Sequence, residues 1–411
     1  AAGARAARLG DPRRADVIAP ARVAAYEVVR RVFEQDAYAD RAFPAAAAGL
    51  DERDRALAQR IAYGTIQRVR TIDHAIDELG RRPTRKLDPP VLAALRIGAY
   101  QLGWLDQVPA HAAASESVEL VRRAGLERAV AFTNAIMRRL SEGLSPLLEA
   151  LPEGPLKHSY PDWVAEVWER DLGREGALAL MRAQNEAPET VVRGDVPGEP
   201  TDVPGAVRVA RVEPAWLEHG RAFPISRASQ LVGLCVGEGG RILDCCAAPG
   251  GKTAMLHGDE VVAVELNEGR ARELEENLRR LGRGDVRVVV GDARELDETG
   301  FDRALVDAPC SGLGVLARRP DLRWRAKPLP ELQLELLRAA AERVRPGGTI
   351  VYSVCTVNAD ENEAVVEASG LAVEPLGDEW PQFRHPRRPE FLLTLPHVHG
   401  TSGFFVSRLR K

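Results

Sequence analysis

The sequence predicts a multidomain protein, with an all-α helical bundle, a small α+β connector and a Rossmann-like α/β domain in that order. Three observations support this prediction. The chain has 411 residues, which is too long for a single hydrophobic core. Residues 18–143 show only helical periodicity. From about residue 238 onward, short β-branched runs alternate with helical segments.

The composition is typical of a water-soluble protein, with 45% hydrophobic residues, 28% charged residues and a net charge of −4. No apolar run reaches the roughly 18 residues that span a bilayer. Residues 1–17 lack the apolar core of a signal peptide, and we expect a basic flexible arm there. An odd count of five cysteines favours reduced thiols. We therefore expect a cytoplasmic monomer without membrane association, in which any nucleic-acid surface is local.

In the helical segment, residues 18–143, apolar side chains recur at the spacing of one helix face. The first such stripe contains Ala25, Val28, Val29, Val32 and Phe33. A second stripe follows the "DPP" sequence, where proline can begin a helix, and a third runs through "AFTNAIMRRL". These stripes predict a helical bundle that no strand interrupts.

The rest of the chain is predicted to form two further parts. Residues 144–220 combine a helical stretch with a Pro/Gly-rich one, which indicates the α+β connector. Residues 221–411 form the Rossmann-like domain, with strands in "RILDCC", "VVAVEL", "VRVVVGD", "DRALVDAPC" and "GGTIVYSVC". Strands that alternate with helices in this way form a parallel sheet, whose ligands bind beyond the carboxyl ends of the strands.

A small-residue turn, "LDCCAAPGGKT" at residues 243–253, joins the first of these strands to the next segment. Its small residues allow backbone N–H groups to approach a ligand closely. A P-loop would need a glycine where Cys246 stands, and the dinucleotide-binding pattern G-x-G-x-x-G is absent. The candidate cofactor-binding residues of this turn are Cys246, Ala247, Ala248, Pro249, Gly250, Gly251 and Lys252.

Two carboxylates end the next two strands. Glu265 lies 21 positions after Asp244, which is close to the spacing of a carboxylate that binds ribose hydroxyls. Asp292 ends the third strand and is placed to accept a hydrogen bond from an adenine amino group. Such carboxylates also commonly cap helices. Together with the glycine turn, however, they favour a site for an adenosine without a polyphosphate, and S-adenosylmethionine fits that description.

Two cysteines follow strands at the ligand edge of the predicted sheet. Cys310 lies in "DAPCSG" and Cys355 in "YSVCT". A lone cysteine is most often a small core residue, and we assign Cys235 and Cys245 to the core. Cys310 and Cys355 differ because they end adjacent strands and can face one reactive centre. The segment after Cys355 is predicted to begin a helix whose dipole favours a thiolate.

This arrangement suits chemistry at carbon 5 of a pyrimidine, which is a poor nucleophile. Addition of a thiolate to carbon 6 activates carbon 5 toward a methyl donor, and a base must then remove the carbon 5 proton. One thiol for attack and a second group for release would explain two cysteines. Asp307, three residues before Cys310, is placed to hold the polar edge of the base.

The blocks "LDCCAAPGGKT", "DAPCSGLGVLARRPDLRW" and "YSVCTVNADENEAVVE" resemble those of the RNA cytosine-carbon-5 methyltransferases of the Nol1/Nop2/Sun family. The helical half resembles the NusB-like domain of the RsmB (Sun, Fmu) branch. The resemblance implies a class I methyltransferase domain with S-adenosylmethionine as cofactor. It implies Cys355 as the nucleophile, Cys310 as the residue that assists release and Asp307 as the carboxylate that holds cytosine. It also adds Arg270 to the cofactor-binding residues, with Glu265 and Asp292, and counts Asp307 among them as well.

The resemblance implies a cytidine of 16S rRNA as the target, in free rRNA or in an immature small-subunit particle. Two alternatives remain at this stage: a non-catalytic RNA-binding ribosome-assembly factor, and a cytosine methyltransferase of tRNA or 23S rRNA. A methyltransferase of exocyclic amines is disfavoured, because "DAPC" lacks the Asn/Asp-Pro-Pro-aromatic turn of those enzymes.

Several segments depart from the family pattern or fall outside it. Residues 225–227 and Ser402 differ from the usual residues of the family, and residues 225–227 border the expected cofactor site. Residues 317–327 carry five basic side chains, and we expect Arg318, Arg323 and Trp324 to contact RNA. His397 and His399 lack a third ligand nearby, so we expect no metal.

Overall fold

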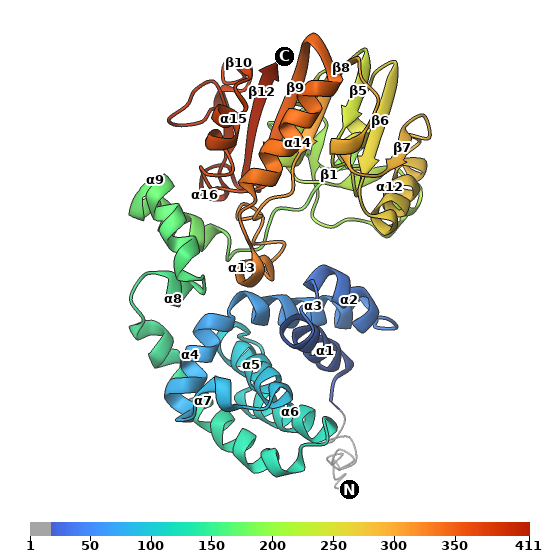
Figure 1. The fold of residues 1–411 in the computed structure, drawn as a ribbon. Helices are drawn as coiled ribbons and strands as arrows, with labels where there is room; N and C mark the ends of the chain where they lie inside the picture. The colour runs from blue at the N-terminus through green and yellow to red at the C-terminus, as the bar shows by residue number, and fades with distance from the viewer. Residues whose placement is uncertain (1–17) are drawn as a thin grey trace, which may run out of the picture. The chain divides into compact units, whose positions relative to one another are not determined.

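The computed structural model describes residues 18–411, and the expected basic arm at residues 1–17 lies outside the described residues. The chain divides into two compact units (Figure 1). The first comprises the described residues up to Pro161 together with Arg319–Asp321, and the second comprises Asp162–Arg318 and Leu322–Lys411. Among the described residues, no helix combines the length and the apolar character that crossing a membrane requires.

The first unit is entirely helical in its described residues. Its helices are α1 (Pro20–Glu34), α2 (Ala39–Ala46), α3 (Glu52–Gln67), α4 (Val69–Gly80), α5 (Pro89–Trp104), α6 (Ala110–Arg123), α7 (Val130–Ala150) and α8 (Pro155–His158). The Asp51 side chain caps α3, and α1 and α5 each begin with proline. The predicted bundle is therefore present. Its expected end at residue 143 falls inside α7, which continues to Ala150.

Close helix packing in this unit depends on a glycine of α5. A Cβ atom at Gly98 would lie 2.3 Å from the Ser117 hydroxyl oxygen of α6 and 2.5 Å from the Met137 methyl carbon of α7. Any larger residue would therefore force the Ser117 and Met137 side chains to move. The stripe expected in α1 faces the interior, because Ala25, Val28 and Val29 are fully buried.

The second unit begins with α9 (Asp162–Ala183), which is interrupted at Gly173 by a positive φ of 73°. A four-stranded antiparallel sheet follows, in the order β2-β3-β1-β4. Its strands are β1 (Val191–Gly194), β2 (Glu199–Pro200), β3 (Ala206–Arg208) and β4 (Ala222–Pro224), with α10 (Pro214–Glu218) before β4. Because β4 pairs with β1, the connector sheet continues past the expected boundary at residue 220.

The main sheet of the second unit has the order β10-β12-β9-β8-β5-β6-β7, with β11 paired to β12. Its strands are β5 (Arg241–Asp244), β6 (Glu260–Glu265), β7 (Arg287–Val290), β8 (Phe301–Asp307), β9 (Val344–Val354), β10 (Ala372–Glu374), β11 (Leu392–Thr394) and β12 (Phe404–Arg410). The strands from β5 to β9 are parallel, as predicted, and β12 runs antiparallel beside β9. The three strands after β9 were missed by the sequence analysis.

Helices cover this sheet and bury its central strands. They are α11 (Arg227–Val236), α12 (Glu268–Arg280), α14 (Pro330–Arg343) and α15 (Glu363–Ser369), with the short α13 (Leu322–Arg325) and α16 (Pro396–His399) in loops. Figure 1 shows α14 running across the sheet, where it contacts β8 and β9. Burial on both faces explains why the central strands read as near-continuous apolar runs.

The strand order places a ligand site at one point of the sheet edge. β5 pairs with β6 on one side and with β8 on the other, so the chain reverses its direction of winding there. In open α/β sheets, ligands bind beyond the carboxyl ends of the strands at such a switch point. The loops after β5 and β8 carry the glycine turn and Cys310, so both lie at the expected ligand site.

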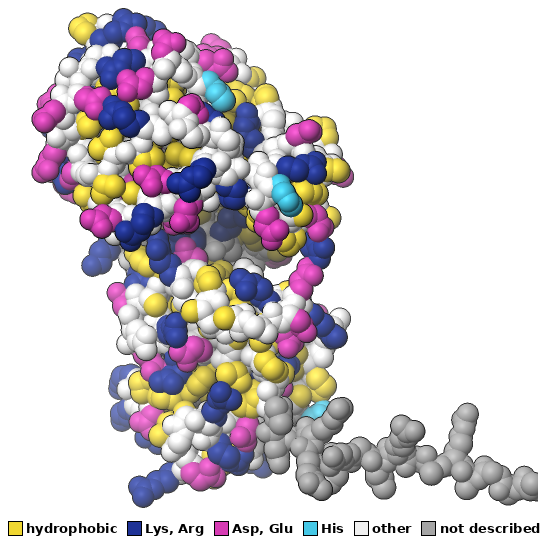
Figure 2. Space-filling view, turned by 90° about the vertical axis from the view of Figure 1, so that its right-hand side faces the viewer, with side chains coloured by type: hydrophobic (Ala, Val, Ile, Leu, Met, Phe, Trp, Pro, Cys, Tyr) yellow, Lys and Arg dark blue, Asp and Glu magenta, His cyan; other side chains and the backbone are white. Residues whose placement is uncertain are grey.

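On the face drawn in Figure 2, basic and acidic side chains are interspersed. This distribution agrees with the small net charge of −4. On this face, the mixed surface gives no extended field of one sign.

Candidate active site

The two thiols expected at the sheet edge lie in contact. Cys355 directly follows β9, and Cys310 follows β8 by three residues, with Asp307 opposite Ser353 in the pairing of these strands. The two Sγ atoms are 3.3 Å apart. The convergence of these sulfurs, which was predicted from adjacent strand ends, is therefore confirmed.

The pair is electrostatically unequal. The hydrogen bond from the Cys310 thiol lowers the pKa of Cys355, and the positive charge of Lys252 acts in the same direction. Shared hydrogen bonding with Cys355 and burial raise the pKa of Cys310 well above its usual value. When Cys355 ionises, its thiolate accepts this hydrogen bond and Cys310 donates it as the thiol. Since only the thiolate is strongly nucleophilic, the geometry favours Cys355 as the attacking group.

The pKa values of the other three cysteines are raised by burial. Burial raises the pKa of Cys235 to about 12 and raises the pKa values of Cys245 and Cys246 as well. Cys355 is thus the one cysteine of this chain whose pKa is lowered. The expected cause was wrong, however: α15 begins at Glu363, eight residues after Cys355, so the lowering comes from Cys310 and Lys252 instead of a helix dipole.

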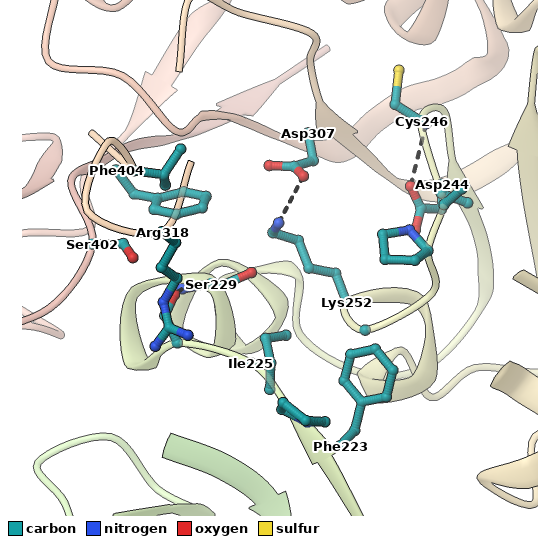
Figure 3. Close-up of a pocket in the computed structure, with 17 residues that line it drawn as sticks. Phe223, Ile225, Ser229, Asp244, Cys246, Lys252, Asp307, Arg318, Ser402 and Phe404 are labelled. Carbon is teal, nitrogen blue, oxygen red and sulfur yellow. Dashed lines mark hydrogen bonds and ion pairs between the residues drawn. The ribbon is translucent and has the colours of Figure 1, made fainter. Parts of the chain in front are cut away.

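Asp307 is held at the end of β8 by two donors. Lys252 Nζ lies 2.6 Å from its Oδ2 atom, and Ser353 Oγ donates to its Oδ1 atom at 2.7 Å. Figure 3 shows Lys252 extending toward Asp307 across the cavity. Lys252 Nζ also lies 5.0 Å from the centroid of the Phe404 ring. These contacts fix the carboxylate in one orientation, which a group that binds the polar edge of a base requires.

The glycine turn after β5 lines a cavity of about 240 Å³, which we call the Asp307 cavity. Its walls include Phe223, Ile225, Ser226, Ser229, Cys246, Lys252, Asp307, Val315, Arg318, Ser402 and Phe404. A Cβ atom at Gly251 would lie 2.6 Å from the Phe223 ring, so glycine is required for the turn to approach this wall. In Figure 3, Cys246 and Asp244 lie on one side of the cavity, and Arg318 and Ser402 lie on the other.

Asp244 anchors the glycine turn through hydrogen bonds. It is 1% exposed, and it accepts hydrogen bonds from Thr253 Oγ1 at 2.8 Å and from the Cys246 backbone N–H at 3.4 Å. Burial raises its pKa from 3.8 to about 6, and the nearby Asp307 charge adds to this rise. The folded protein therefore holds this proton more tightly than the unfolded chain between these two pH values.

This raised pKa predicts a pH-dependent stability. The contribution is present below about pH 4 and is lost as the pH rises through about 6, so Asp244→Asn should gain stability relative to wild type over that window. We expect the difference in unfolding free energy to grow by on the order of 2 to 3 kcal/mol between pH 4 and 7. Urea denaturation followed by tryptophan fluorescence measures it. Asp297→Asn, at an exposed position, is the control, and a difference that stays constant with pH would contradict the assignment.

The two expected adenosine-binding acids lie at neighbouring strand ends. Glu265 is 4% exposed, and its Oε1 atom accepts from the Asn267 backbone N–H at 3.0 Å. Arg270 lies 3.6 Å from its other oxygen and donates to the Ala248 carbonyl, which links α12 to the glycine turn. Asp292 instead caps a short 3-10 turn and pairs with Arg294, which lowers its pKa. The capping alternative therefore applies to Asp292.

Two exposed apolar residues at these strand ends were not recognised from the sequence. Leu266, which follows Glu265, is 69% exposed, and Val290 at the end of β7 is 52% exposed. Glu265 and Val290 are direct partners in the sheet. A buried carboxylate beside two exposed apolar side chains suits the ribose hydroxyls and the flat face of an adenosine. The residues present therefore fit the expected cofactor.

A buried carboxylate behind the thiols was also missed. Glu361 is fully buried, and its Oε1 atom accepts from the backbone N–H groups of Ser311 at 2.9 Å and Leu329 at 3.1 Å. Gln333 Nε2 donates to the same oxygen at 2.9 Å, and the Ser311 hydroxyl donates to Oε2. Glu361 thus ties the loop after Cys310 to the loop after Cys355. The acidic "NADENE" segment was its only sequence signal.

The residues expected to contact RNA have three different environments. Arg318 is exposed at the rim of the Asp307 cavity and donates to the Glu189 carbonyl. Trp324 is partly buried in α13. Arg323 corrects the expectation, because it is 0% exposed and donates to the Gln184 carbonyl at 2.9 Å. A buried guanidinium of this kind supports the fold and does not reach a phosphate in this conformation.

The divergent segment before α11 borders the site as well. Ile225 and Ser226 line the Asp307 cavity, and Ser226 caps α11. Arg227 points elsewhere: it is 6% exposed, with ion pairs to Glu189 at 2.9 Å and Asp202 at 2.6 Å. Among the described residues, no cluster of three metal-ligating side chains occurs.

The parallel β5–β9 core with an antiparallel β12, the glycine turn and the buried Glu265 carboxylate define an S-adenosylmethionine-dependent methyltransferase. The model of the 16S rRNA methyltransferase RsmB/F family matches residues 232–410, and that of the NusB family matches residues 19–142. The chain belongs to the RsmB/F family, and its cofactor is S-adenosylmethionine.

Similar proteins match over most of the chain. It is 36% identical to the putative methyltransferase Rv1407 of Mycobacterium tuberculosis, over 95% of this chain and 96% of that protein. It is 34% identical to the probable ribosomal RNA small subunit methyltransferase B of Synechocystis, over 95% and 99%. The crystal structure of PH0851 has the same fold, with a TM-score of 0.76, 24% identity and coverage of 96% and 99%.

Proposed function

We propose that this protein methylates carbon 5 of a specific cytidine in 16S rRNA through a covalent adduct with Cys355. The observation that carries the proposal is the thiol pair, with Sγ atoms 3.3 Å apart and a lowered pKa at Cys355 alone among the five cysteines. The Synechocystis relative is named as a small-subunit rRNA methyltransferase, which supports the choice of RNA.

In this proposal, the glycine turn and the neighbouring strand ends bind the cofactor. Cys246 to Lys252 approach it through their backbone, Glu265 binds the ribose hydroxyls, and Leu266 packs on the adenine. Arg270 and Asp292 lie at the rim of this site. When bound, S-adenosylmethionine supplies an electrophilic methyl group on its sulfonium.

The remaining residues act on the base. Asp307, oriented by Lys252 and Ser353, accepts a hydrogen bond from the exocyclic amine of cytosine. The Cys355 thiolate adds to carbon 6, which makes carbon 5 nucleophilic toward the methyl group. A base then takes up the carbon 5 proton. The electron pair of the broken C–H bond restores the ring double bond and expels the Cys355 thiolate, with assistance from Cys310. The ring must be unpaired or flipped out, because a thiol cannot reach it inside a helix.

The helical unit and part of the second unit are proposed to bind the RNA around the target. The NusB-like unit would hold the RNA, while Arg318 and Trp324 would contact nucleotides beside the cavity. We propose that the protein acts in the cytoplasm as a monomer. Its substrate would be free 16S rRNA or an immature small-subunit particle.

Mapping 5-methylcytidine in RNA from a strain that lacks the protein tests this proposal. We expect one cytidine of 16S rRNA to lose the modification, and we expect wild-type protein but not Cys355→Ser to restore it. Loss of a tRNA or 23S rRNA modification instead would show that the proposed target is wrong. If no modification disappears but small subunits assemble slowly, the protein is a non-catalytic assembly factor.

A further inference from the structure

A second cavity adjoins the Asp307 cavity and has no part in the chemistry described above. We call it the His397 cavity. Its volume is about 270 Å³, compared with about 240 Å³ for the Asp307 cavity. The two cavities share Val315, Arg318 and Ser402 as a common wall. If the first has room for a pyrimidine ring, the second has room for another base.

The chemistry of the walls suits a flat heteroaromatic ring. The apolar part of the lining consists of Ala183, Ala187, Pro188, Val315, Ala317 and Pro396. The backbones of Gly314 and Gly400 complete this lining without side chains. Small apolar groups of this kind can cover both faces of a base, and burial of those faces stabilises the bound nucleotide.

One polar group in the lining lacks a partner within the described part of the chain. His397 Nδ1 is buried there without a hydrogen-bond partner. Burial lowers the pKa of His397, so its ring is neutral near pH 7 and can donate or accept one hydrogen bond. A buried polar atom is normally satisfied, and a rotation of the His397 ring that turns this atom toward the cavity would let a bound ligand satisfy it. The edge of a base offers both donors and acceptors.

The wall between the cavities carries the charge that a linked pair of nucleotides needs. Arg318 is exposed there, and its contact with the Glu189 carbonyl leaves other guanidinium donors available for a phosphate. The Glu189 carboxylate in the same lining is paired with Arg227 at 2.9 Å, and its charge also acts on Arg318. Figure 3 shows Arg318 beside Ser402, away from Cys246 and Asp244.

We propose that the His397 cavity binds the base of a nucleotide adjacent to the target cytidine, with Arg318 on the phosphate that joins them. This inference rests on the proposed function and extends it, because it makes the enzyme read two unstacked bases of the RNA. His397 and Arg318 are then specificity-determining residues, and recognition of a neighbouring base would select one unpaired cytidine among many.

The test uses a synthetic RNA hairpin that contains the mapped target cytidine, with an abasic ribose in place of either neighbour. For wild type, we expect one of the two abasic substitutions to lower kcat/KM about tenfold, which is the size of one base-stacking contact. In Ala187→Phe, the added ring should fill the cavity, so kcat/KM on intact RNA should fall by the same factor. The abasic substitution should then lower the kcat/KM of this variant by less than about a further twofold. Ala210→Phe, at an exposed position outside both cavities, should behave as wild type.

His397→Ala provides a second variant that leaves the apolar walls intact. It should lower kcat/KM on intact RNA about fivefold and have no effect on the abasic RNA. The inference is overturned if both abasic RNAs react within twofold of intact RNA, or if the abasic penalty is the same in wild type and Ala187→Phe. If wild type methylates neither the intact hairpin nor 16S rRNA, the proposed function is wrong. This inference, which rests on that function, is then wrong as well.

Discussion

Cys355→Ser is expected to lower methyl transfer to RNA by roughly a thousandfold or more. A serine hydroxyl is not ionised near pH 7, so neither the hydrogen bond from Cys310 nor the charge of Lys252 can produce an anion there. The measurement is transfer of a tritiated methyl group from S-adenosylmethionine to 16S rRNA that lacks the modification. Cofactor binding, followed by calorimetry, should stay near the wild-type value, because Cys355 lies at the thiol pair and outside the glycine turn.

A matched control separates loss of the nucleophile from loss of a buried thiol. Cys235 is 2% exposed in α11 and lies outside the site, so Cys235→Ser should retain turnover even if it unfolds more readily. Turnover in Cys355→Ser within about tenfold of wild type would assign the attack to another group. In that case the contact between the two sulfurs would be a structural feature.

The second large effect is expected for Cys310→Ala, which should accumulate a protein–RNA adduct that survives denaturation. Cys310 lies 3.3 Å from the attacking sulfur, so its removal leaves addition possible but slows release. Denaturing gel electrophoresis with labelled RNA detects the adduct as a shifted band. Cys310→Ala combined with Cys355→Ser should give no such band.

The same variant tests the cause of the lowered pKa. Because the hydrogen bond from Cys310 is the largest contribution, its loss should raise the pKa of Cys355. Alkylation of Cys355 by iodoacetamide should then reach its half-maximal rate at a higher pH than in wild type. An unchanged midpoint would mean that Lys252 alone sets the thiolate, and a midpoint at lower pH would contradict the assignment.

Much of this site could be predicted because strand ends are local features of a sequence. β-branched runs located β8 and β9, and the pairing of neighbouring parallel strands then required Cys310 and Cys355 to meet. The position of Glu265 at the ligand edge could be predicted from its spacing to Asp244, because each of these residues ends a strand. The identity of β12 was missed because an antiparallel strand inserted beside β9 depends on contacts between distant segments.

Other features depend on tertiary contacts that no local pattern encodes. The position of the Lys252 ammonium against Asp307 joins residues 55 positions apart, and Glu361 gathers donors from three segments. Charge alone could not separate exposed Arg318 from buried Arg323, since both lie in one basic stretch. Likewise, the helix after Cys355 begins later than the acidic run indicated, because residues 359–362 form turns first.

The bond between Cys355 and carbon 6 of the target cytosine can be measured directly. RNA with 5-fluorocytidine at the mapped position has no carbon 5 proton to lose, so wild-type protein should stop at the methylated adduct. Tandem mass spectrometry of the digested complex should find a 5-fluoro-5-methyl-dihydrocytidine on the peptide that contains Cys355. The same modification on the Cys310 peptide, or methylated RNA with no attached peptide, would contradict the account.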